Sequence, residues 1–373
     1  MMRVGIMSMQ RIANYGSFLQ AYGLKCMLQE LGCDVEFVDY HPGKPLIPVN
    51  GGDGYGMTRK LLKVIEIMKS GVPLLEKIRY IEYKKNYAKR YYPYLEIGEG
   101  KNYKPKLDLL VIGSDEVFNC VQDNTNVGFS PELFGEGNQA ERLITYAASF
   151  GNTTVEKLQT YGVDEQVKMW LNKIDEISVR DRNSSKIVEK LTGRKPQYHF
   201  DPVLTYDFLG KCEEIPKAVP ELNYIILYGY SGRFTKEECR IIHDYSKKRK
   251  LKVLCIGGVQ EYCDKFVNCN PFQVIAYFQH AECIITDTFH GTIFSVITHK
   301  QFVVFVRKQG YGNSEKLLDI LGRLGLNDRI VNDPEKISEC LENKIDYKLI
   351  NEIIRKERKR SREYLQEQIR NKL

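Results

Sequence analysis

Apolar residues along this chain gather in short runs that end abruptly at polar groups. The run from Leu107 to Ile112 ends in Gly-Ser-Asp, the run from Leu143 to Ala148 is followed by Ser149, and the segment Glu176 to Val179 by Arg180. Strands that are apolar on both faces are typical of parallel sheets covered by helices, and such sheets bind ligands at the carboxyl ends of their strands. The pattern therefore predicts an α/β protein with a cleft along one edge of its sheet.

The first forty residues carry the pattern of a βαβ unit. A short strand is expected at Arg3–Met7, then a helix with apolar residues at helical spacing, and a second strand at Asp34–Tyr40. The loop between them lacks the glycine fingerprint GxGxxG, so no bound dinucleotide is implied. Asn14, Tyr15 and Gly16 at the entrance of the helix either hold a substrate through amide and backbone groups or form a simple turn and cap.

A second α/β unit follows a proline-containing linker. Strands are expected at 224–228 and 252–256, with an amphipathic helix between them. The predicted organisation is an N-terminal Rossmann-like domain at 1–205 with a helical insertion at about 57–95, a linker at 206–223, a C-terminal Rossmann-like domain at 224–345, and a C-terminal helix at 346–373 that packs back on the N-terminal domain.

The stretch from Ala281 to Arg307 predicts a buried strand, a polar turn, an apolar helix and a second strand at Phe302–Val306. His290 and Gly291 lie where the first strand meets the helix. An imidazole exchanges protons near neutral pH, a glycine lets backbone approach a ligand, and a helix start attracts anions. The turn is therefore a candidate catalytic site, with a capping or packing role as the alternative.

These residues also resemble a known family. The segment TDTFHGTIFS is similar to the TDSFHGxxFS signature of the polysaccharide pyruvyl transferase family. Further segments of that family occur in the expected order, and the resemblance covers about residues 2–330. They are RIANYGSFLQAY (Arg11–Tyr22), VIGSDEVFN (Val111–Asn119), YAASFG (Tyr146–Gly151), ISVRD (Ile177–Asp181) and DPVL (Asp201–Leu204).

The resemblance implies a fold and a reaction. The fold is two Rossmann-like domains that face each other across a cleft, the GT-B arrangement. The reaction moves a pyruvyl group from phosphoenolpyruvate to two hydroxyls of a sugar in a cell-surface polysaccharide or its precursor, which forms a cyclic ketal and releases phosphate. We expect no cofactor, since phosphoenolpyruvate is a substrate, and no metal, since cationic side chains can neutralise it.

Three residues are the candidate catalytic groups. His290 is predicted to act as a general acid–base or to protonate the leaving phosphate. Arg180 offers a bidentate fork for a carboxylate or phosphate, with an ion pair to Asp181 as the alternative. Asp115 is either the base for the acceptor hydroxyl or a helix cap. The candidate substrate-binding residues are Thr288, Phe289, Gly291, Arg307, Lys308, Asn14, Tyr15, Gly16, Ser114 and Ser149.

One departure from the family pattern concerns charge. The family often has N-S-R-I after the last of these strands, whereas this chain has Glu315 and Lys316 at the third and fourth positions. If that arginine contacts the substrate, the anion contact here is weakened or moves to Lys308 or Lys316. Whether Glu315 alters the usual activity is left open by the sequence.

The predicted insertion interleaves tyrosines with basic residues, and we expect it on the acceptor side of the cleft. Aromatic faces pack against sugar rings, and long cations reach the phosphates of a lipid-linked acceptor. The alternative is a solvated helix face. The residues concerned are Lys84, Tyr87, Arg90, Tyr91 and Tyr94.

Composition limits the location and the partners. No apolar stretch reaches the roughly 18 residues of a membrane span, and the N-terminus does not resemble a signal peptide. We expect a cytoplasmic protein, with the inner face of the membrane as an option. The net charge of +7 is concentrated in two helical segments, Lys77–Arg90 and Ile353–Tyr364. They lack a nucleic-acid motif, so contact with a membrane surface is the alternative to plain solvation. The ten cysteines lack the CxxC pairs of a zinc site.

Two other functions fit the same fold. A GT-B glycosyltransferase that uses a nucleotide sugar would need an acidic ribose contact in the second domain, and no convincing one is present. A non-catalytic scaffold of a polysaccharide-synthesis assembly would tolerate the loss of His290.

Overall fold

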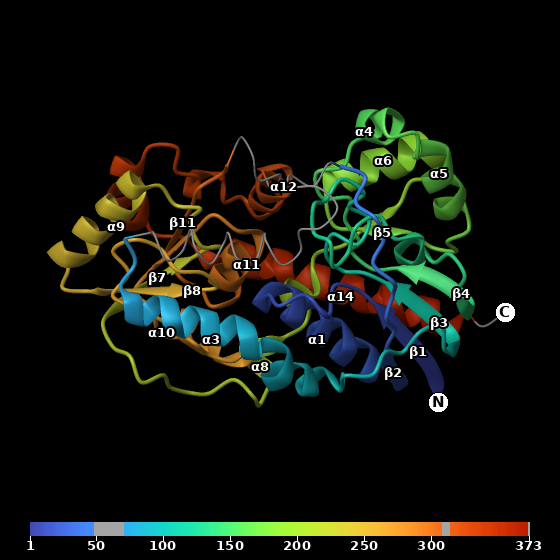
Figure 1. Ribbon diagram of the computed structural model, residues 1–373, viewed down its shortest axis with the longest axis horizontal. Helices are drawn as coiled ribbons and strands as arrows, with labels where there is room; N and C mark the ends of the chain where they lie inside the picture. The colour runs from blue at the N-terminus through green and yellow to red at the C-terminus, as the bar shows by residue number, and fades with distance from the viewer. Residues whose placement is uncertain (48–70, 308–313, 372–373) are drawn as a thin grey trace.

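Two parallel β-sheets, each covered by helices, lie side by side in the computed structural model (Figure 1), which describes residues 1–47, 71–307 and 314–371. The N-terminal sheet has the order β2–β1–β3–β4, and every pairing in it is parallel. Single bridges from Ile144 to Glu176 and from Ala148 to Val179 connect it to the pair β5–β6. The strands are β1 (Met2–Met7), β2 (Cys33–Phe37), β3 (Lys106–Ile112), β4 (Gln139–Thr145), β5 (Ser178–Val179) and β6 (Gln197–Tyr198).

The C-terminal sheet has the order β11–β10–β7–β8–β9 and is also parallel throughout. Its central strand β7 is buried at all five positions, as a strand covered on both faces must be. The strands are β7 (Tyr224–Tyr228), β8 (Lys252–Ile256), β9 (Lys265–Phe266), β10 (Ile284–Thr286) and β11 (Phe302–Val304). The predicted pair of Rossmann-like domains facing a cleft is therefore confirmed, although β11 ends two residues before the predicted Val306.

Helices follow most strands and begin at residues that cap them. Thr235 and Asn270 each form a capping box at the start of α9 and α10, in which the side chains of the cap and of the third helical residue bind each other's backbone N–H groups. In the N-terminal domain the helices are α1 (Tyr15–Gln29), α4 (Val155–Thr160), α5 (Asp164–Asn172), α6 (Arg182–Thr192) and α7 (Pro202–Thr205). In the linker lies α8 (Phe208–Lys211), and in the C-terminal domain are α9 (Lys236–Lys248), α10 (Pro271–His280), α11 (Phe289–Ile297), α12 (Ser314–Leu324) and α13 (Ile337–Glu342).

Helix α3 (Leu74–Tyr91) departs from the N-terminal domain but packs on the edge of the other sheet. The buried Glu76 carboxylate accepts the backbone N–H of Phe266 in β9 at 2.6 Å. Tyr91 donates its hydroxyl to the carbonyl of Cys269 at 2.9 Å. This helix therefore joins the two domains; the predicted insertion also includes residues 57–70, which lie outside the described residues.

Two of the three predicted tyrosines, Tyr87 and Tyr91, are not available to a sugar, contrary to the prediction, whereas Tyr94 after the helix is 44% exposed and packs edge-on against Phe272. Tyr87 is fully buried and donates to the carbonyl of Asn14, and Tyr91 is 6% exposed. Rings at helical spacing fill the space between α3 and α1, where they bury apolar area that water would otherwise cover. Arg90 pairs with Glu82 on the surface, while Lys84 donates to the carbonyl of Ala13 beside the interdomain cleft.

The two domains share one apolar core. The ring of Phe272 in α10 packs edge-on against Phe18 and Tyr22 of α1, with ring centroids 5.8 and 4.9 Å apart. Buried residues of both sheets belong to the same continuous cluster. An interface of this kind resembles a domain interior more than a transient contact, so the relative position of the domains is set by packing.

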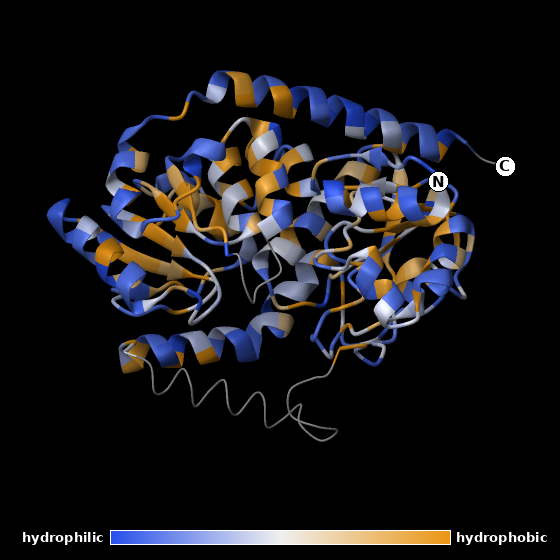
Figure 2. Cartoon of the chain, turned by 90° about the horizontal axis from the view of Figure 1, so that it is seen from above, coloured by the Kyte–Doolittle hydropathy of each residue, from blue (hydrophilic) through white to orange (hydrophobic). Residues whose placement is uncertain are grey.

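Helix α14 (Tyr347–Arg370) runs along both domains (Figure 2). Near its start, Tyr347 donates to the carbonyl of Lys300 at 2.6 Å. Near its end, Tyr364 donates to the carbonyl of Thr145 at 2.9 Å, and Arg142 binds Gln368. No helix among the described residues combines the length and the apolar character needed to cross a bilayer.

Under α14 lies a buried imidazole that resists protonation. His199 is 1% exposed, its ring packs against those of Tyr146 and Tyr364, and its Nδ1 is 2.8 Å from the hydroxyl of Ser178. Burial, together with the smaller effect of the cations Arg360 and Arg323, lowers the pKa of His199 to about 3.

We predict that this histidine makes stability depend on pH. The pKa of His199 is lower in the folded than in the unfolded state. Below pH 6.5 the imidazole is therefore protonated in the unfolded state but neutral in the folded state, which favours unfolding. The contribution of His199 to the free energy of unfolding should be fully present above pH 6.5. At pH 5 the free energy of unfolding should be lower by about 2 kcal/mol. Urea unfolding of the wild type and of His199→Gln measures this. The variant should lack this part of the pH dependence, and an unchanged slope in the variant would contradict the assignment.

Candidate active site

A cleft of about 240 Å³ lies between the two domains, at the carboxyl ends of their strands. Its walls come from the loop after β1, the residues after β3, the loop after β7 and the start of α11. The charged groups on its surface are Lys84, Asp115, Glu116, Arg233, His290 and Lys316. The predicted cleft is therefore present at the polar end of β3, whereas the polar residues Ser149 and Arg180, predicted at the same rim, are buried below its surface.

The start of α11 is held by its own cap. Thr288 lines the cleft, and its hydroxyl accepts the N–H of Gly291 at 2.9 Å. A Cβ at Gly291 would lie 2.2 Å from Oγ1 of Thr286 and 2.7 Å from the ring of Tyr228. Packing within the protein is therefore sufficient to require a glycine at this position. The first N–H groups of α11 lack acceptors within the helix, and the residues Thr288, Phe289 and His290 at this helix start line the cleft.

His290 lies on the wall of the cleft with 12% of its side chain exposed. Its Nε2 atom is 3.7 Å from Oδ2 of Asp201, too long for a hydrogen bond but close enough for an ion pair when the imidazole is protonated. Its Nδ1 faces the first turn of α1, where a Cβ at Gly16 would lie only 2.1 Å from it. Gly16 thus allows α1 and the imidazole, which belong to different domains, to come into direct contact.

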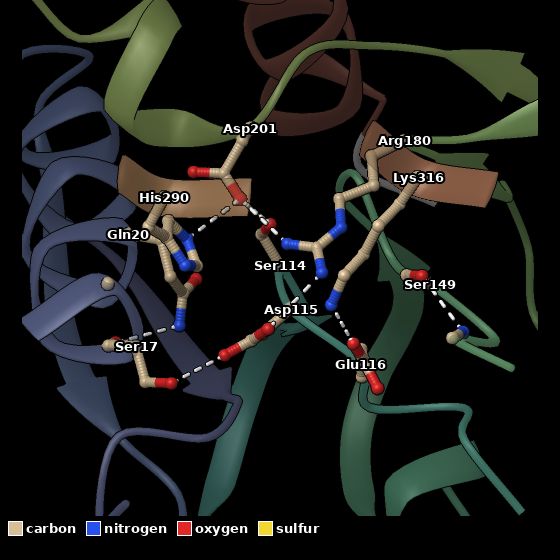
Figure 3. Close-up of polar contacts among 12 residues, drawn as sticks. Ser17, Gln20, Ser114, Asp115, Glu116, Ser149, Arg180, Asp201, His290 and Lys316 are labelled. Atoms are coloured by element: carbon tan, nitrogen blue, oxygen red, sulfur yellow. Dashed lines mark hydrogen bonds and ion pairs between the residues drawn. The ribbon is translucent and has the colours of Figure 1, made fainter. Parts of the chain in front are cut away.

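Arg180 is buried behind the cleft surface. Its Nη1 is 2.8 Å from Asp201 and its Nη2 is 3.3 Å from Asp115 (Figure 3). Its guanidinium lies 4.6 Å from the ring centre of Phe289. The alternative of an ion pair with Asp181 is wrong, because Asp181 turns back to cap α6 and accepts from Ser184. Arg180 belongs to the cluster around His290 but is not part of the cleft lining.

Asp115 lies on the cleft surface between the two domains. It is held at φ 79°, a conformation that a non-glycine residue adopts at a cost of about 1–3 kcal/mol, and such residues are common at functional sites. Its Oδ2 accepts the hydroxyl of Ser17 at 2.6 Å. Burial alone would raise the pKa of Asp115, but Arg180 and then His290 outweigh it and lower the pKa. The carboxylate is therefore ionised at neutral pH.

Asp201 is a member of this cluster that the sequence analysis did not select. It is 1% exposed, and its Oδ2 is shared by Arg180, the hydroxyl of Ser114 at 3.0 Å and the edge of His290 (Figure 3). Burial alone would raise the pKa of Asp201, but His290 and Arg180 hold it at about 2. The signal was present, since Asp201 follows the strand β6 as other polar residues follow theirs.

Lys316 is the cation in the segment where this chain has Glu315 and Lys316 in place of the last two residues of the family's N-S-R-I. Its ammonium forms an ion pair with Glu116 across the cleft, and the same Glu116 accepts from Asn119. Burial alone would raise the pKa of Glu116, but Lys316 lowers it. Glu315 is exposed at the start of α12, so of these two residues it is Lys316 that faces the site.

Arg307 has a structural role. It pairs with Glu238 at 2.6 Å and with the fully buried Asp287 at 3.3 Å, so its charge is used within the domain. Arg233 binds the same Asp287 at 2.7 Å and also lines the cleft. Burial raises the pKa of Asp287, and both arginines oppose that rise. Lys308, the other predicted cation, lies outside the described residues.

The remaining predicted contacts divide between cleft and core. Asn14 lines the cleft, caps α1 by accepting from Gly16 and Ser17, and donates to the hydroxyl of Tyr230 in the other domain at 2.6 Å. Tyr15 is 1% exposed and donates to the carbonyl of Cys269, so only a minor part of it reaches the cleft.

Ser114 and Ser149 are fully buried, contrary to a role in binding substrate. Ser114 donates to Asp201, and Ser149 donates to Asp181. Polar groups that follow a buried strand were expected on the rim, but these hydroxyls satisfy carboxylates below it. All ten cysteines are free thiols, and the described residues contain no set of three His, Cys, Asp or Glu side chains that could hold a metal ion.

Two parallel α/β domains with a charged cleft and a histidine at a helix start define a GT-B-like protein with a polar site between its domains. A family model for polysaccharide pyruvyl transferase matches residues 14–309. The chain therefore belongs to the polysaccharide pyruvyl transferase family.

Solved structures resemble the chain over most of its length at low sequence identity. The glycotransferase of kitacinnamycin is 10% identical, with a TM-score of 0.48 over 100% of this chain and 99% of that one. A UDP-N-acetylglucosamine 2-epimerase from Rickettsia bellii is 11% identical, with a TM-score of 0.44 over 99% of this chain and 98% of that one. No curated protein matches the chain in sequence.

We predict that Gly16 and His290 are energetically coupled. Gly16→Ala should lower the free energy of unfolding by about 1–3 kcal/mol, because its methyl group would overlap the imidazole. In a His290→Ala background the methyl group has room, so the same substitution should cost nothing. Denaturant unfolding of the four proteins gives the coupling.

Gly23→Ala is the matched control, since it adds a methyl group to the same helix, 3.2 Å from the carbonyl of Pro202. Its cost should be equal in both backgrounds. An equal cost of Gly16→Ala in the two backgrounds would contradict the contact.

Proposed function

We propose that this member of the family transfers a pyruvyl group from phosphoenolpyruvate to two hydroxyls of one sugar, as a cyclic ketal. The observation that supports it most directly is the position of His290. Its imidazole lies on the cleft wall at the first turn of α11, beside a cluster of ionised carboxylates and cations. A proton donor and an anion-binding helix start are thereby placed at the same point.

The donor's negative charge requires cations on the surface of the cleft. Lys316 and Arg233 line it from the C-terminal domain, and Lys84 lines it from α3. We assign the phosphate to the first turn of α11 and Lys316, where backbone N–H groups and an ammonium converge. Lys316 then exchanges Glu116 for the phosphate, so the ion pair of the free protein marks the anion subsite.

The chemistry balances without a further reactant. Protonation of carbon 3 turns the methylene into a methyl group and makes carbon 2 electrophilic. One sugar hydroxyl bonds to carbon 2 and loses its proton, the carbon–oxygen bond to phosphate breaks, and the second hydroxyl closes the ring as it loses its own proton. Of the two hydroxyl protons, one replaces that delivered to carbon 3, and the other leaves with hydrogen phosphate.

His290 and Asp115 divide these proton transfers. His290 supplies the proton to the donor, at carbon 3 or at the leaving phosphate. Asp115 is ionised, lies on the cleft surface opposite, and accepts a proton from the attacking hydroxyl. Ser17, whose hydroxyl already donates to Asp115, holds the carboxylate in place.

The acceptor lies toward the N-terminal wall in this proposal. Asn14, Gln122 and Asn124 line that part of the cleft, and amide groups can both donate to and accept from sugar hydroxyls. A lipid-linked precursor at the inner face of the cytoplasmic membrane fits the proposal, because Lys84 lies at the same wall and can pair with a phosphate.

We expect phosphoenolpyruvate to raise the melting temperature of the wild type, and UDP and other nucleotides to leave it unchanged. With acceptor oligosaccharide, phosphate should be released in proportion to ketal formed, as followed by mass spectrometry. A stabilising nucleotide without any effect of phosphoenolpyruvate would overturn the proposal in favour of a nucleotide-sugar enzyme.

Variants should separate binding from chemistry. His290→Ala should lower kcat by about 10²–10⁴-fold with a small change in the KM for phosphoenolpyruvate, because proton transfer acts in the transition state. Lys316→Ala should raise that KM about tenfold or more, since it removes a charge contact. Lys248→Ala, at an exposed position of α9, is the control and should change neither constant. An unchanged kcat in His290→Ala would exclude the imidazole from the chemistry.

A further inference from the structure

The Oδ2 atom of Asp201 lies close to the hydroxyl of Ser114, the guanidinium of Arg180 and the imidazole of His290. The Oδ1 atom of Asp201 accepts the N–H of Val203 at 3.0 Å, which fixes the carboxylate at the start of α7. Its Oδ2 accepts from Ser114 and from Arg180 and lies 3.7 Å from Nε2 of His290. The neighbours of Oδ2 are therefore fixed by the fold before any substrate binds.

The two nitrogens of His290 have different surroundings. Nε2 is fully buried, lacks a hydrogen-bond partner among the described residues, and points toward Asp201 (Figure 3). Nδ1 lies at the opposite side of the ring, against the turn of α1 whose neighbours Asn14, Tyr15 and Ser17 line the cleft. Because Nε2 is fully buried, a ligand in the cleft cannot exchange a proton with it, which leaves Nδ1 as the nitrogen for that exchange.

We propose that Asp201 is a positioning residue for His290, and that Arg180 acts on the reaction through Asp201 instead of through the substrate. The carboxylate lies within ion-pair distance of Nε2 and attracts the imidazole when it is protonated, which holds the ring in place while it delivers a proton from Nδ1. Ser114 and Arg180 orient Asp201 for this task. The inference deepens the proposed function and rests on it for its catalytic part.

Burial is the reason that Arg180 cannot contact the donor directly. Its side chain is 1% exposed, covered by Phe289, and both ends of its fork are occupied by Asp115 and Asp201. A substrate that reached it would have to displace a buried carboxylate. Lys316 carries its charge at the cleft surface, so the contact with the donor belongs to Lys316.

The charged residues around His290 belong to four different parts of the chain. Asp201 precedes α7, Arg180 follows β5, Asp115 follows β3 and Lys316 belongs to α12. The first turn of α1 adds neutral groups only. Asp201 is the carboxylate within ion-pair distance of the imidazole, so its removal changes the charge next to the ring more than any other single substitution.

The first experiment needs no catalysis. The imidazole of His290 is titrated by NMR in the wild type and in Asp201→Asn, with the signal assigned by its loss in His290→Gln. The midpoint of the titration should move to lower pH by about one unit or more in Asp201→Asn, because an opposite charge close to the ring is lost. An unmoved midpoint would overturn the pairing, whether or not the protein uses phosphoenolpyruvate.

The second experiment is kinetic. In Asp201→Asn, kcat should fall about 10–100-fold and the acidic limb of its pH profile should move to lower pH, while the KM for phosphoenolpyruvate is not raised. Arg180→Lys should likewise lower kcat without raising the KM for phosphoenolpyruvate. A raised KM with kcat unchanged would show that these residues bind the donor and would overturn the inference. A wild type that consumes no phosphoenolpyruvate would refute the proposed function instead.

Asp181→Asn is the matched control, since Asp181 is a buried carboxylate in the same domain that accepts from Ser149 and Ser184. It should leave the titration and the kcat pH profile unchanged. If Asp201→Asn does not fold, Ser114→Ala removes one of the hydrogen bonds to Oδ2 and should produce the same changes at a few-fold size. Identical behaviour of Ser114→Ala and wild type would overturn the inference.

Discussion

The buried ion pair between Arg180 and Asp201 is the constraint on which the cleft depends. A guanidinium removed from water must have carboxylate partners, or its desolvation would destabilise the fold. Asp201 and Asp115 supply them from different loops, so the ends of β3 and β5 and the start of α7 are fixed relative to one another. His290, from the other domain, lies against the same carboxylate oxygen. The geometry of the site is thus a by-product of how one buried charge is neutralised.

Much of the fold could be predicted because its signals are local. The apolar run that forms β3 and the strand–turn–helix order around α11 appear as expected, since burial on both faces and a polar turn leave a direct trace in the sequence. The position of α3 against the C-terminal sheet could not be predicted from the sequence in this way. Its pattern shows which face is apolar but not which domain covers it, and Tyr83 and Tyr87 proved to be core residues between α1 and β9.

The sequence predicted which residues belong to the site better than it predicted which of them pair with each other. Asp115 and Arg180 are brought together because parallel strands end at a common edge, and His290 joins them from the other domain because the two domains pack against each other. The alternative considered for Arg180, an ion pair with the adjacent Asp181, was wrong: Asp181 caps its own helix, whereas Asp201, 21 positions away, accepts from the guanidinium. Pairing across such a separation is decided by tertiary packing, and the same is true of Glu116 with Lys316.

Three parts of the described chain connect the two domains: helix α3, the linker and helix α14. The linker contains only the short helix α8, and its Leu222 is among the most exposed apolar side chains. A break in the backbone there would leave two fragments that each carry a helix packed on the other. Covalent continuity at the linker is therefore not what keeps the two halves of the cleft in register; the interlocked helices and the common core do so, as in a split protein whose pieces reassemble.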